Sequence, residues 1–325
     1  MTMADLTKAK PAVKKKKHFW SKDDTELSIL ALPTTIWYIL FCYLPMFGIV
    51  LAFKKYKIVD ATKSFVWNVI HSQWAGFDNF LYFLKQNTFP MILRNTLLYN
   101  ALFIVLDIVI PVLLAILINN IYSKKMSKTY QTLMFMPHFM SWVVIAYFVY
   151  AFLVTDKGLL NSIIKMCGGQ PVAWYQSPQY WPFILTFLHV WKTVGYNMVV
   201  YLASITGIDT SLYEAAVLDG ASKSQQARYI TIPSLRPMII MMFILAVGRI
   251  FSSDFGLFYQ ATRGAGIPLN KVATTFDVEI YKMVTTNADQ GRNAAASMFQ
   301  SIIGCITILS ANAIVRKVDK ASALI

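Results

Sequence analysis

Six apolar stretches, each long enough to cross a bilayer, constrain this chain more than any other feature. They cover residues 28–53, 95–121, 131–154, 181–205, 236–258 and 292–315. About 20 apolar residues in a helix cross the roughly 30 Å of hydrocarbon in a membrane. Backbone polar groups in hydrocarbon need internal partners, which an α-helix supplies within each segment. The sequence therefore predicts an all-α, polytopic membrane protein with six transmembrane helices.

The composition agrees with a membrane domain. Of the 325 residues, 56% are hydrophobic and only 14% are charged, whereas an ordinary soluble domain carries about 25% charged residues. The three cysteines, Cys42, Cys167 and Cys305, are too few and too scattered for a disulfide framework or a metal site. We interpret them as packing residues.

The positive charge of the chain predicts its orientation. Seven lysines lie within the first 22 residues of a chain whose net charge is +14, and lysines favour the cytoplasmic side, where anionic lipids attract them. We expect a basic cytoplasmic tail over 1–27, a transmembrane domain over 28–315 with a cytoplasmic loop at 206–235, and a cytoplasmic tail over 316–325. Both termini would then be cytoplasmic. Lys54, Lys55, Lys57 and Lys63 oppose this orientation, but the N-terminal group is larger.

A Lys-rich run is also typical of nucleic-acid-binding proteins. The rest of the chain offers no groove-reading module, so we expect no nucleic-acid partner. The run could equally resemble the start of a signal peptide. The apolar segment that follows is much longer than the roughly 7–15 residues of a signal sequence, so we expect it to remain as the first span.

The loop between the fourth and fifth spans has the most specific pattern in the chain. Ser211 and Glu214 form a candidate capping box, Gly220 suits the left-handed end of a helix, and Ser222 with Gln225 opens a second helix. Pro233 is expected to close the unit. These features predict two short helices around a glycine, which could be an ordinary cytoplasmic hairpin or a surface that another protein approaches closely.

The same loop resembles the EAA motif of binding-protein-dependent ABC import permeases. The likeness lies in three segments, Glu214-Ala215-Ala216, Asp219-Gly220-Ala221 and Ile230-Thr231-Ile232-Pro233. Weaker likeness extends from about Leu27 to the end of the chain, and it favours the Gram-positive branch that carries polysaccharides and complex oligosaccharides. Thr210 stands where that branch usually has proline, a change that still permits a turn.

The resemblance implies a type I ABC importer permease, a transport subunit rather than an enzyme, in the bacterial plasma membrane. It implies that a groove of a cytoplasmic ATPase subunit receives this loop, with a coupling surface formed by Glu214, Ala215, Ala216, Asp219, Gly220 and Ala221. It also implies a second homologous permease in a heterodimer, two ATPase subunits and an extracellular solute-binding lipoprotein. ATP and Mg would bind to the ATPase partners, and this chain would bind no cofactor itself.

Several polar residues within the spans call for partners or a wet cavity, because a charge at membrane depth costs at least about 2.5–3.5 kcal/mol. Asp107 is one of them. The residues that could line a sugar route are Trp191, Lys192, Tyr196, Asn197, Arg249 and Asp254. Lys192 and Arg249 would suit an acidic sugar, but a structural pairing with an aspartate across the bundle explains them equally well.

No catalytic set and no Gly-rich phosphate-binding loop are present. His138 and His189 lack the neighbouring ligands that a metal site requires, so we interpret them as packing residues. The function most favoured is import of an oligosaccharide, driven by ATP hydrolysed elsewhere. The alternative is an ion-coupled secondary carrier or channel that would use the intramembrane carboxylates.

Overall fold

The computed structural model describes residues 21–286 and 289–318. Most of the expected N-terminal tail, 1–27, and most of the C-terminal tail, 316–325, lie outside these ranges. The chain divides into two compact units between Val50 and Leu51, and each is described by itself.

The first unit holds most of the first membrane span. Helix α1 (Lys22–Tyr38) begins at a capping box in which Ser21 and Asp24 satisfy each other's backbone amides. It continues through a π-helical turn, η1 (Ile39–Tyr43), into the 3-10 helix η2 (Leu44–Phe53). The helical segment Asp23–Phe53 is long and apolar enough to cross a membrane.

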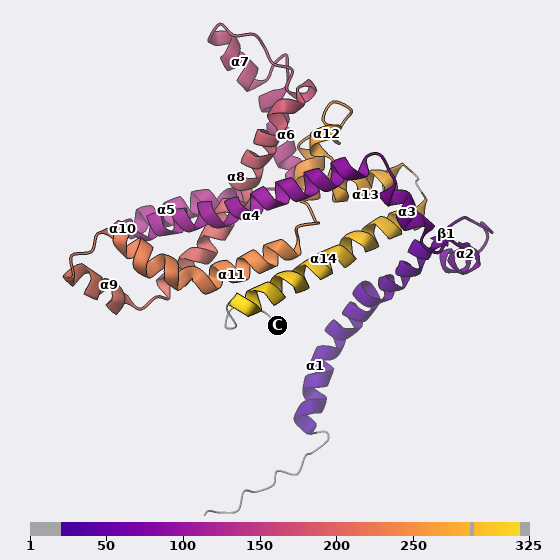
Figure 1. Cartoon of the computed structure of the whole chain (residues 1–325), viewed down its shortest axis with the longest axis horizontal. Helices are drawn as coiled ribbons and strands as arrows, with labels where there is room; N and C mark the ends of the chain where they lie inside the picture. Colours follow the sequence, from indigo (N-terminus) through magenta and orange to yellow (C-terminus); the bar gives the residue numbers. More distant parts are fainter. Residues whose placement is uncertain (1–20, 287–288, 319–325) are drawn as a thin grey trace, which may run out of the picture. The chain divides into compact units, whose positions relative to one another are not determined.

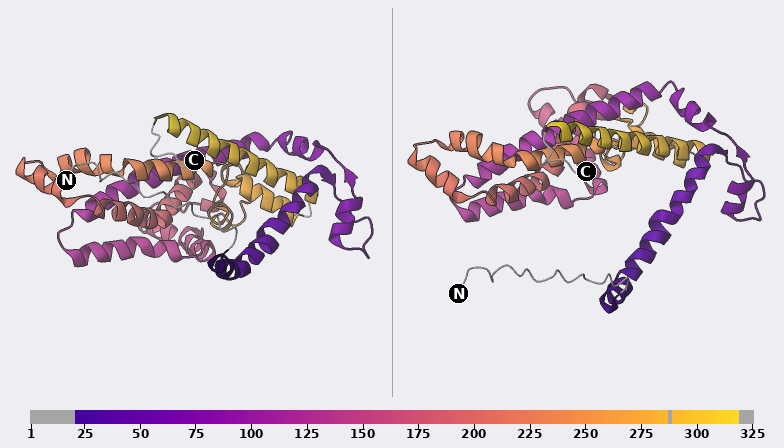
Figure 2. Two further views of the ribbon diagram at one scale, coloured as in Figure 1. Left: turned by 90° about the horizontal axis from the view of Figure 1, so that it is seen from below. Right: turned by 60° about the horizontal axis from the view of Figure 1, so that its bottom comes forward.

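The second unit is dominated by long helices joined by short elements (Figures 1 and 2). The elements before the fourth span are β1 (Lys54–Lys55), α2 (Phe65–His71), β2 (Gln73–Trp74), α3 (Asp78–Leu84), α4 (Phe89–Asn119), α5 (Lys124–Phe135), η3 (Met136–Phe139), α6 (Trp142–Leu153), α7 (Leu159–Met166), η4 (Trp174–Gln176) and η5 (Pro178–Tyr180). The later elements are α8 (Trp181–Thr206), α9 (Thr210–Leu218), α10 (Lys223–Gln226), η6 (Ala227–Thr231), α11 (Ile232–Gly248), η7 (Gly256–Gln260), α12 (Asn270–Ala273), α13 (Phe276–Thr285) and α14 (Gln290–Val318). Strands β1 and β2 form one short antiparallel pair.

Helices α4 and α8 form the main packing pair of this unit, and α11 packs against α14. One buried cluster lies between α4, α8 and α11 and includes Val112, Tyr201 and Leu235. Another gathers Trp181 of α8, Phe258 of η7 and residues of α6. These two cores hold the polar residues of α8 at fixed positions between its neighbours.

Within the described residues, five helices have the length and composition to cross a membrane, and they correspond to five of the six predicted spans. The third predicted span, 131–154, corresponds to a pair of helices, Lys124–Phe139 and Trp142–Leu153, bent by 97°. The break follows Pro137, which has no amide to donate, and Ser141 caps the second half by accepting from the Val144 amide. The fifth span, predicted to reach residue 258, ends at Gly248 and gives way to a turn before η7.

Gly195 allows α8 to approach α5 at close range. A Cβ atom added to Gly195 would lie 1.9 Å from the carbonyl oxygen of Met134 and 2.7 Å from the Cα atom of Phe135. These are backbone atoms, so relief of the clash requires α5 to move.

We expect Gly195→Ala to lower the thermal unfolding midpoint of the purified protein, since overpacking of a close contact costs about 1–3 kcal/mol. Gly207→Ala is the matched control, because its Cβ would meet its nearest neighbour, the Ser204 carbonyl oxygen, at 3.5 Å. Equal midpoints for the two variants would contradict the close approach of α5 and α8.

Candidate functional site

The loop after α8 forms the expected two helices around a glycine. Helix α9 ends in a left-handed residue, Gly220, with φ of +77°. The amide of Gly220 donates to the Val217 carbonyl at 3.0 Å, and that of Ala221 donates to the Ala216 carbonyl at 2.8 Å. This pair of bonds is the Schellman motif, which glycine favours because it has no Cβ. The predicted role of Gly220 in ending the helix is confirmed.

The start of α9 differs from the prediction. Asp209, not Ser211, is the N-cap, and its carboxylate accepts from the Ser211 amide at 2.9 Å. The backbone and side-chain hydrogen bonds from Ser211 lower the pKa of the Asp209 carboxyl. Ser211 therefore lies inside the helix and makes no capping box with Glu214. The second predicted box is confirmed, because Ser222 and Gln225 bond reciprocally at the start of α10.

Pro233 does not close the loop as predicted. Residues Lys223–Gly248 form one continuous helical segment, in which Pro233 occupies the first turn of α11. The π-helical turn η6 precedes it, and such a turn accommodates a local break in the α-helical hydrogen-bond ladder. The second helix of the loop is thus the beginning of the fifth membrane span.

Most predicted coupling residues are accessible. Glu214, Ala215, Asp219 and Gly220 are exposed, and Ala216 and Ala221 are half-buried. The sequence interpretation missed three exposed apolar side chains on the same helix, Leu212, Val217 and Leu218, and the last is 89% exposed. The sequence could have indicated them, because these apolar residues lie in the predicted loop 206–235, outside any span. Apolar side chains in such a loop have no core to enter and tend to form an interaction surface.

Tyr213 anchors α9 to the rest of the unit. Its hydroxyl lies 2.9 Å from the Thr231 hydroxyl in η6. Both residues line a cavity of about 220 Å³ that Asn119 and Asn120, at the end of α4, also border. Helices α9 and α10 therefore lie beside the end of α4 (Figure 1).

Lys192 ties α8 to the break in the third span. Its Nζ atom donates to the backbone carbonyls of His138, at 2.9 Å, and Met140. It also lies 5.3 Å from the centre of the Trp142 ring. These carbonyls lack helical partners because the helix is interrupted there. The hydrogen-bond partners of this cation are thus backbone oxygens, and the predicted aspartate across the bundle, Asp254, acts on it only as a nearby charge.

Asp254 belongs to the same cluster. The Trp142 indole donates to its Oδ2 atom at 2.6 Å, and the Gly256 amide donates to its Oδ1 atom at 3.0 Å. A Cβ on Gly256 would lie 2.1 Å from Trp142 Cδ1, so the glycine permits this packing. Trp142 consequently joins α6, Lys192 of α8 and the segment after α11.

Asp107 of α4 has its partners on α8. Its carboxylate lies 3.0 Å from His189 Nε2 and accepts from the Thr193 hydroxyl at 2.8 Å. The His189 ring stacks on Phe103 at a centroid distance of 3.7 Å. Within the described residues, no group of three or more His, Cys, Asp or Glu side chains is arranged to hold a metal ion.

The other predicted pathway residues do not join this cluster. Trp191 and Tyr196 are 37% and 45% exposed, and Tyr196 stacks on His138. Asn197 is half-buried. Arg249 is exposed and borders a separate cavity of about 530 Å³ with residues of α13 and α14, including Asp277 and Gln300. Burial raises the pKa of Asp277, although hydrogen bonds from the Ser253 amide and Gln300 oppose this shift.

Comparison with known proteins finds one family and close structural relatives. Residues 107–321 match the family described as binding-protein-dependent transport system inner membrane component. The chain is 31% identical to the protein LplB of Bacillus subtilis over 92% of this chain and 91% of LplB. It is also 31% identical to the polygalacturonan/rhamnogalacturonan transport system permease protein YteP of the same species, over 90% of this chain and 88% of YteP.

One solved structure extends the comparison to three dimensions. It is a bacterial alginate ABC transporter in complex with an alginate pentasaccharide-bound periplasmic protein. A chain of that complex matches with a TM-score of 0.81 and 30% identity, covering 92% of this chain and 96% of that one. The likeness therefore includes both the sequence and the arrangement of the helices.

We expect Lys192→Met to speed amide hydrogen exchange across residues 138–146, because it leaves the half-buried carbonyls of His138 and Met140 without their donor. An unsatisfied polar group costs roughly 1–3 kcal/mol. We therefore expect the exchange rates of these amides to rise about tenfold or more. Lys157→Met, at an exposed position outside the spans, is the control. Unchanged exchange in the Lys192 variant would show that the ammonium does not hold the break.

Proposed function

Because the chain belongs to the family of binding-protein-dependent transport system inner membrane components, we propose that it forms half of the route by which an ATP-driven importer carries an oligosaccharide or polysaccharide fragment into the cell. It is a multi-pass transport subunit of an ABC importer. The carbohydrate assignment is supported by the names of its relatives, which include a polygalacturonan/rhamnogalacturonan permease and an alginate importer.

The observation that carries the coupling proposal is the continuity of the loop with a membrane span. Helix α9 presents exposed Glu214 and Leu218, and only the four residues 219–222, with the left-handed Gly220 among them, separate it from the 26-residue helical segment Lys223–Gly248. A push on α9 is therefore delivered to the cytoplasmic end of α11. We assign the coupling surface to Glu214, Ala215, Ala216, Asp219, Gly220 and Ala221, together with the exposed apolar side chains beside them.

The partners follow from this division of work. Two ATPase subunits bind ATP and Mg and hydrolyse the nucleotide, while this chain supplies no hydrolytic group. A second, different permease completes the route, and an extracellular solute-binding lipoprotein delivers the sugar. Both termini lie on the cytoplasmic side with α9, as the lysines at the start of α5 support.

Within the proposed sugar route we distinguish two roles. Trp191, Tyr196, Asn197 and Arg249 have exposed or half-buried side chains available to hydroxyl groups and sugar faces. Lys192 and Asp254 are engaged by backbone and Trp142. They shape the wall of the route by fixing the broken span.

We expect Glu214→Arg to reduce ATP-dependent uptake and ATPase association by about tenfold or more, which corresponds to a loss of roughly 1.4 kcal/mol at the interface. The measurements are sugar uptake into vesicles that contain the complete transporter, and co-purification of the ATPase. Glu26→Arg is a matched control, because Glu26 is an exposed glutamate outside the loop and lies before the predicted first span, 28–53.

Two results would contradict the proposal. The first is normal uptake and normal ATPase association in the Glu214→Arg variant. The second is transport by the purified chain in vesicles without any ATPase, driven by an ion gradient. The second result would favour a secondary carrier.

A further inference from the structure

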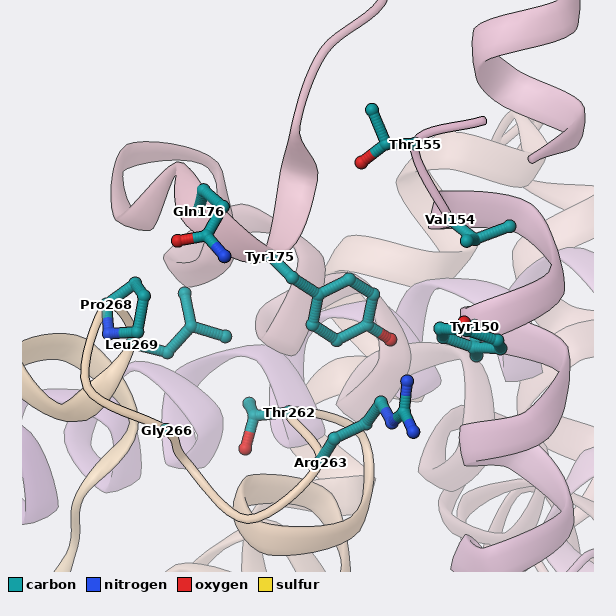
Figure 3. Close-up of a pocket in the computed structure, with 10 residues that line it drawn as sticks. All are labelled: Tyr150, Val154, Thr155, Tyr175, Gln176, Thr262, Arg263, Gly266, Pro268 and Leu269. Atoms are coloured by element: carbon teal, nitrogen blue, oxygen red, sulfur yellow. The ribbon is translucent and has the colours of Figure 1, made fainter. Parts of the chain in front are cut away.

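A pocket of about 390 Å³ lies at the end of α6 (Figure 3), and α6 and α9 lie apart in the second unit (Figure 1). Its walls come from three segments: the last turn of α6 with Thr155, the 3-10 helix η4, and the turn that follows η7. Tyr150, Tyr175 and Arg263 gather on one side of it, and Leu269 belongs to the buried cluster beneath. The volume is within the range of about 300–1,000 Å³ that is usual for small-ligand sites.

The turn that carries Arg263 is strained and firmly held. Arg263, Gly264 and Ala265 have φ values of +56°, +90° and +47°, and the left-handed region is unfavourable for arginine and alanine. The Ala265 amide donates to the Thr262 hydroxyl at 2.9 Å, and the Lys282 ammonium donates to the Ala265 carbonyl at 3.0 Å. Strain of this kind persists only where the surroundings enforce it, and it gathers at ligand sites.

Arg263 gives the pocket a positive charge, and no acidic side chain among the described lining residues neutralises it. The Arg263 guanidinium carbon lies 4.3 Å from the centre of the Tyr150 ring, and the side chain is exposed. None of the described residues that line the pocket is a carboxylate. Burial raises the pKa of Tyr175 to about 12, with the Arg263 charge opposing the shift, so its hydroxyl stays neutral.

We propose that this pocket binds a carboxylated sugar unit of the incoming oligosaccharide. The guanidinium of Arg263 offers a planar fork of donors that matches a carboxylate. The Tyr150 ring holds this guanidinium in place, and the Tyr175 ring supplies a flat apolar surface for a sugar face. Gln176 and Thr155 border the same space with groups that bond hydroxyls. The inference rests on the proposed function and narrows its substrate to an acidic carbohydrate.

A carboxylate on a docked protein is the competing occupant. Such a side chain would use Arg263 but would leave the Tyr175 ring and the polar groups of Gln176 and Thr155 without a partner. A sugar acid engages all of these groups, and the geometry therefore favours it.

The test compares uptake of two probes by the complete transporter in vesicles: a galacturonate trimer and its methyl ester, which lacks the negative charge. Arg263→Gln is expected to raise the apparent KM for the acidic trimer about tenfold, as loss of a charge-assisted contact implies. It should leave kcat and uptake of the ester unchanged. Arg263→Lys should restore part of the loss.

Arg292→Gln is the matched control. Arg292 also stacks on a tyrosine, with its guanidinium carbon 3.7 Å from the Tyr82 ring, but it lies 3.9 Å from the carboxylate of Asp289. Its loss should leave both apparent KM values at the wild-type level.

Three results would overturn the inference. Arg263→Gln could leave uptake of the acidic trimer unchanged, it could impair both probes equally, or it could weaken capture of the sugar-free binding protein, which would indicate a protein contact. A wild-type transporter that imports neutral oligosaccharides but no acidic trimer would also overturn it and leave the proposed function intact. If ATP drives uptake of neither class of oligosaccharide, the proposed function itself fails.

Discussion

The structure depends on the interaction between one ammonium group and the backbone at a broken membrane helix. A span that bends by 97° leaves carbonyls without helical donors, and such groups are costly wherever water is scarce. Lys192 of α8 supplies the missing donor to His138 and Met140. The bend then places Trp142 where its indole meets Asp254, which in turn caps the turn leading to η7. Lys192 and Trp142 thus hold together α8, the start of α6 and the segment after α11, which are far apart in the sequence.

The proposed path of force from α9 into the membrane domain uses a different arrangement. The accessible helix α9 is anchored by the Tyr213 hydroxyl to η6, and α10, η6 and α11 follow one another without a break. Contacts between α11 and α14 extend this path to the last span. The helical segment Lys223–Gly248, which follows α9 after the turn at Gly220, therefore leads without a break to the part of the molecule that borders the Arg249 cavity.

Much of this architecture could be predicted from the sequence, because hydropathy and helix-ending residues act locally. The spans, the left-handed Gly220 and the Ser222–Gln225 box are examples. The bend and the early end of the fifth span were missed, because a hydropathy window reports transfer from water and not backbone continuity. The N-cap was misplaced because Asp209 and Ser211 are both good caps only two residues apart. The partner of Lys192 could not be found, because it is a set of carbonyls more than 50 residues away, with no side-chain signature.

The π-helical turn Ala227–Thr231 has a consequence for how the loop is oriented. A π turn inserts one residue into an α-helix, and each residue of an α-helix advances the side chains by about 100° around the axis. The side chains of α10 are therefore rotated about the helix axis relative to the positions that an unbroken α-helix would give them with respect to α11. Removal of one residue from this turn would regularise the helix and swing α9 around the axis of the fifth span. The direction in which α9 points thus depends on a single extra residue in the helix that follows it, and not only on the loop itself.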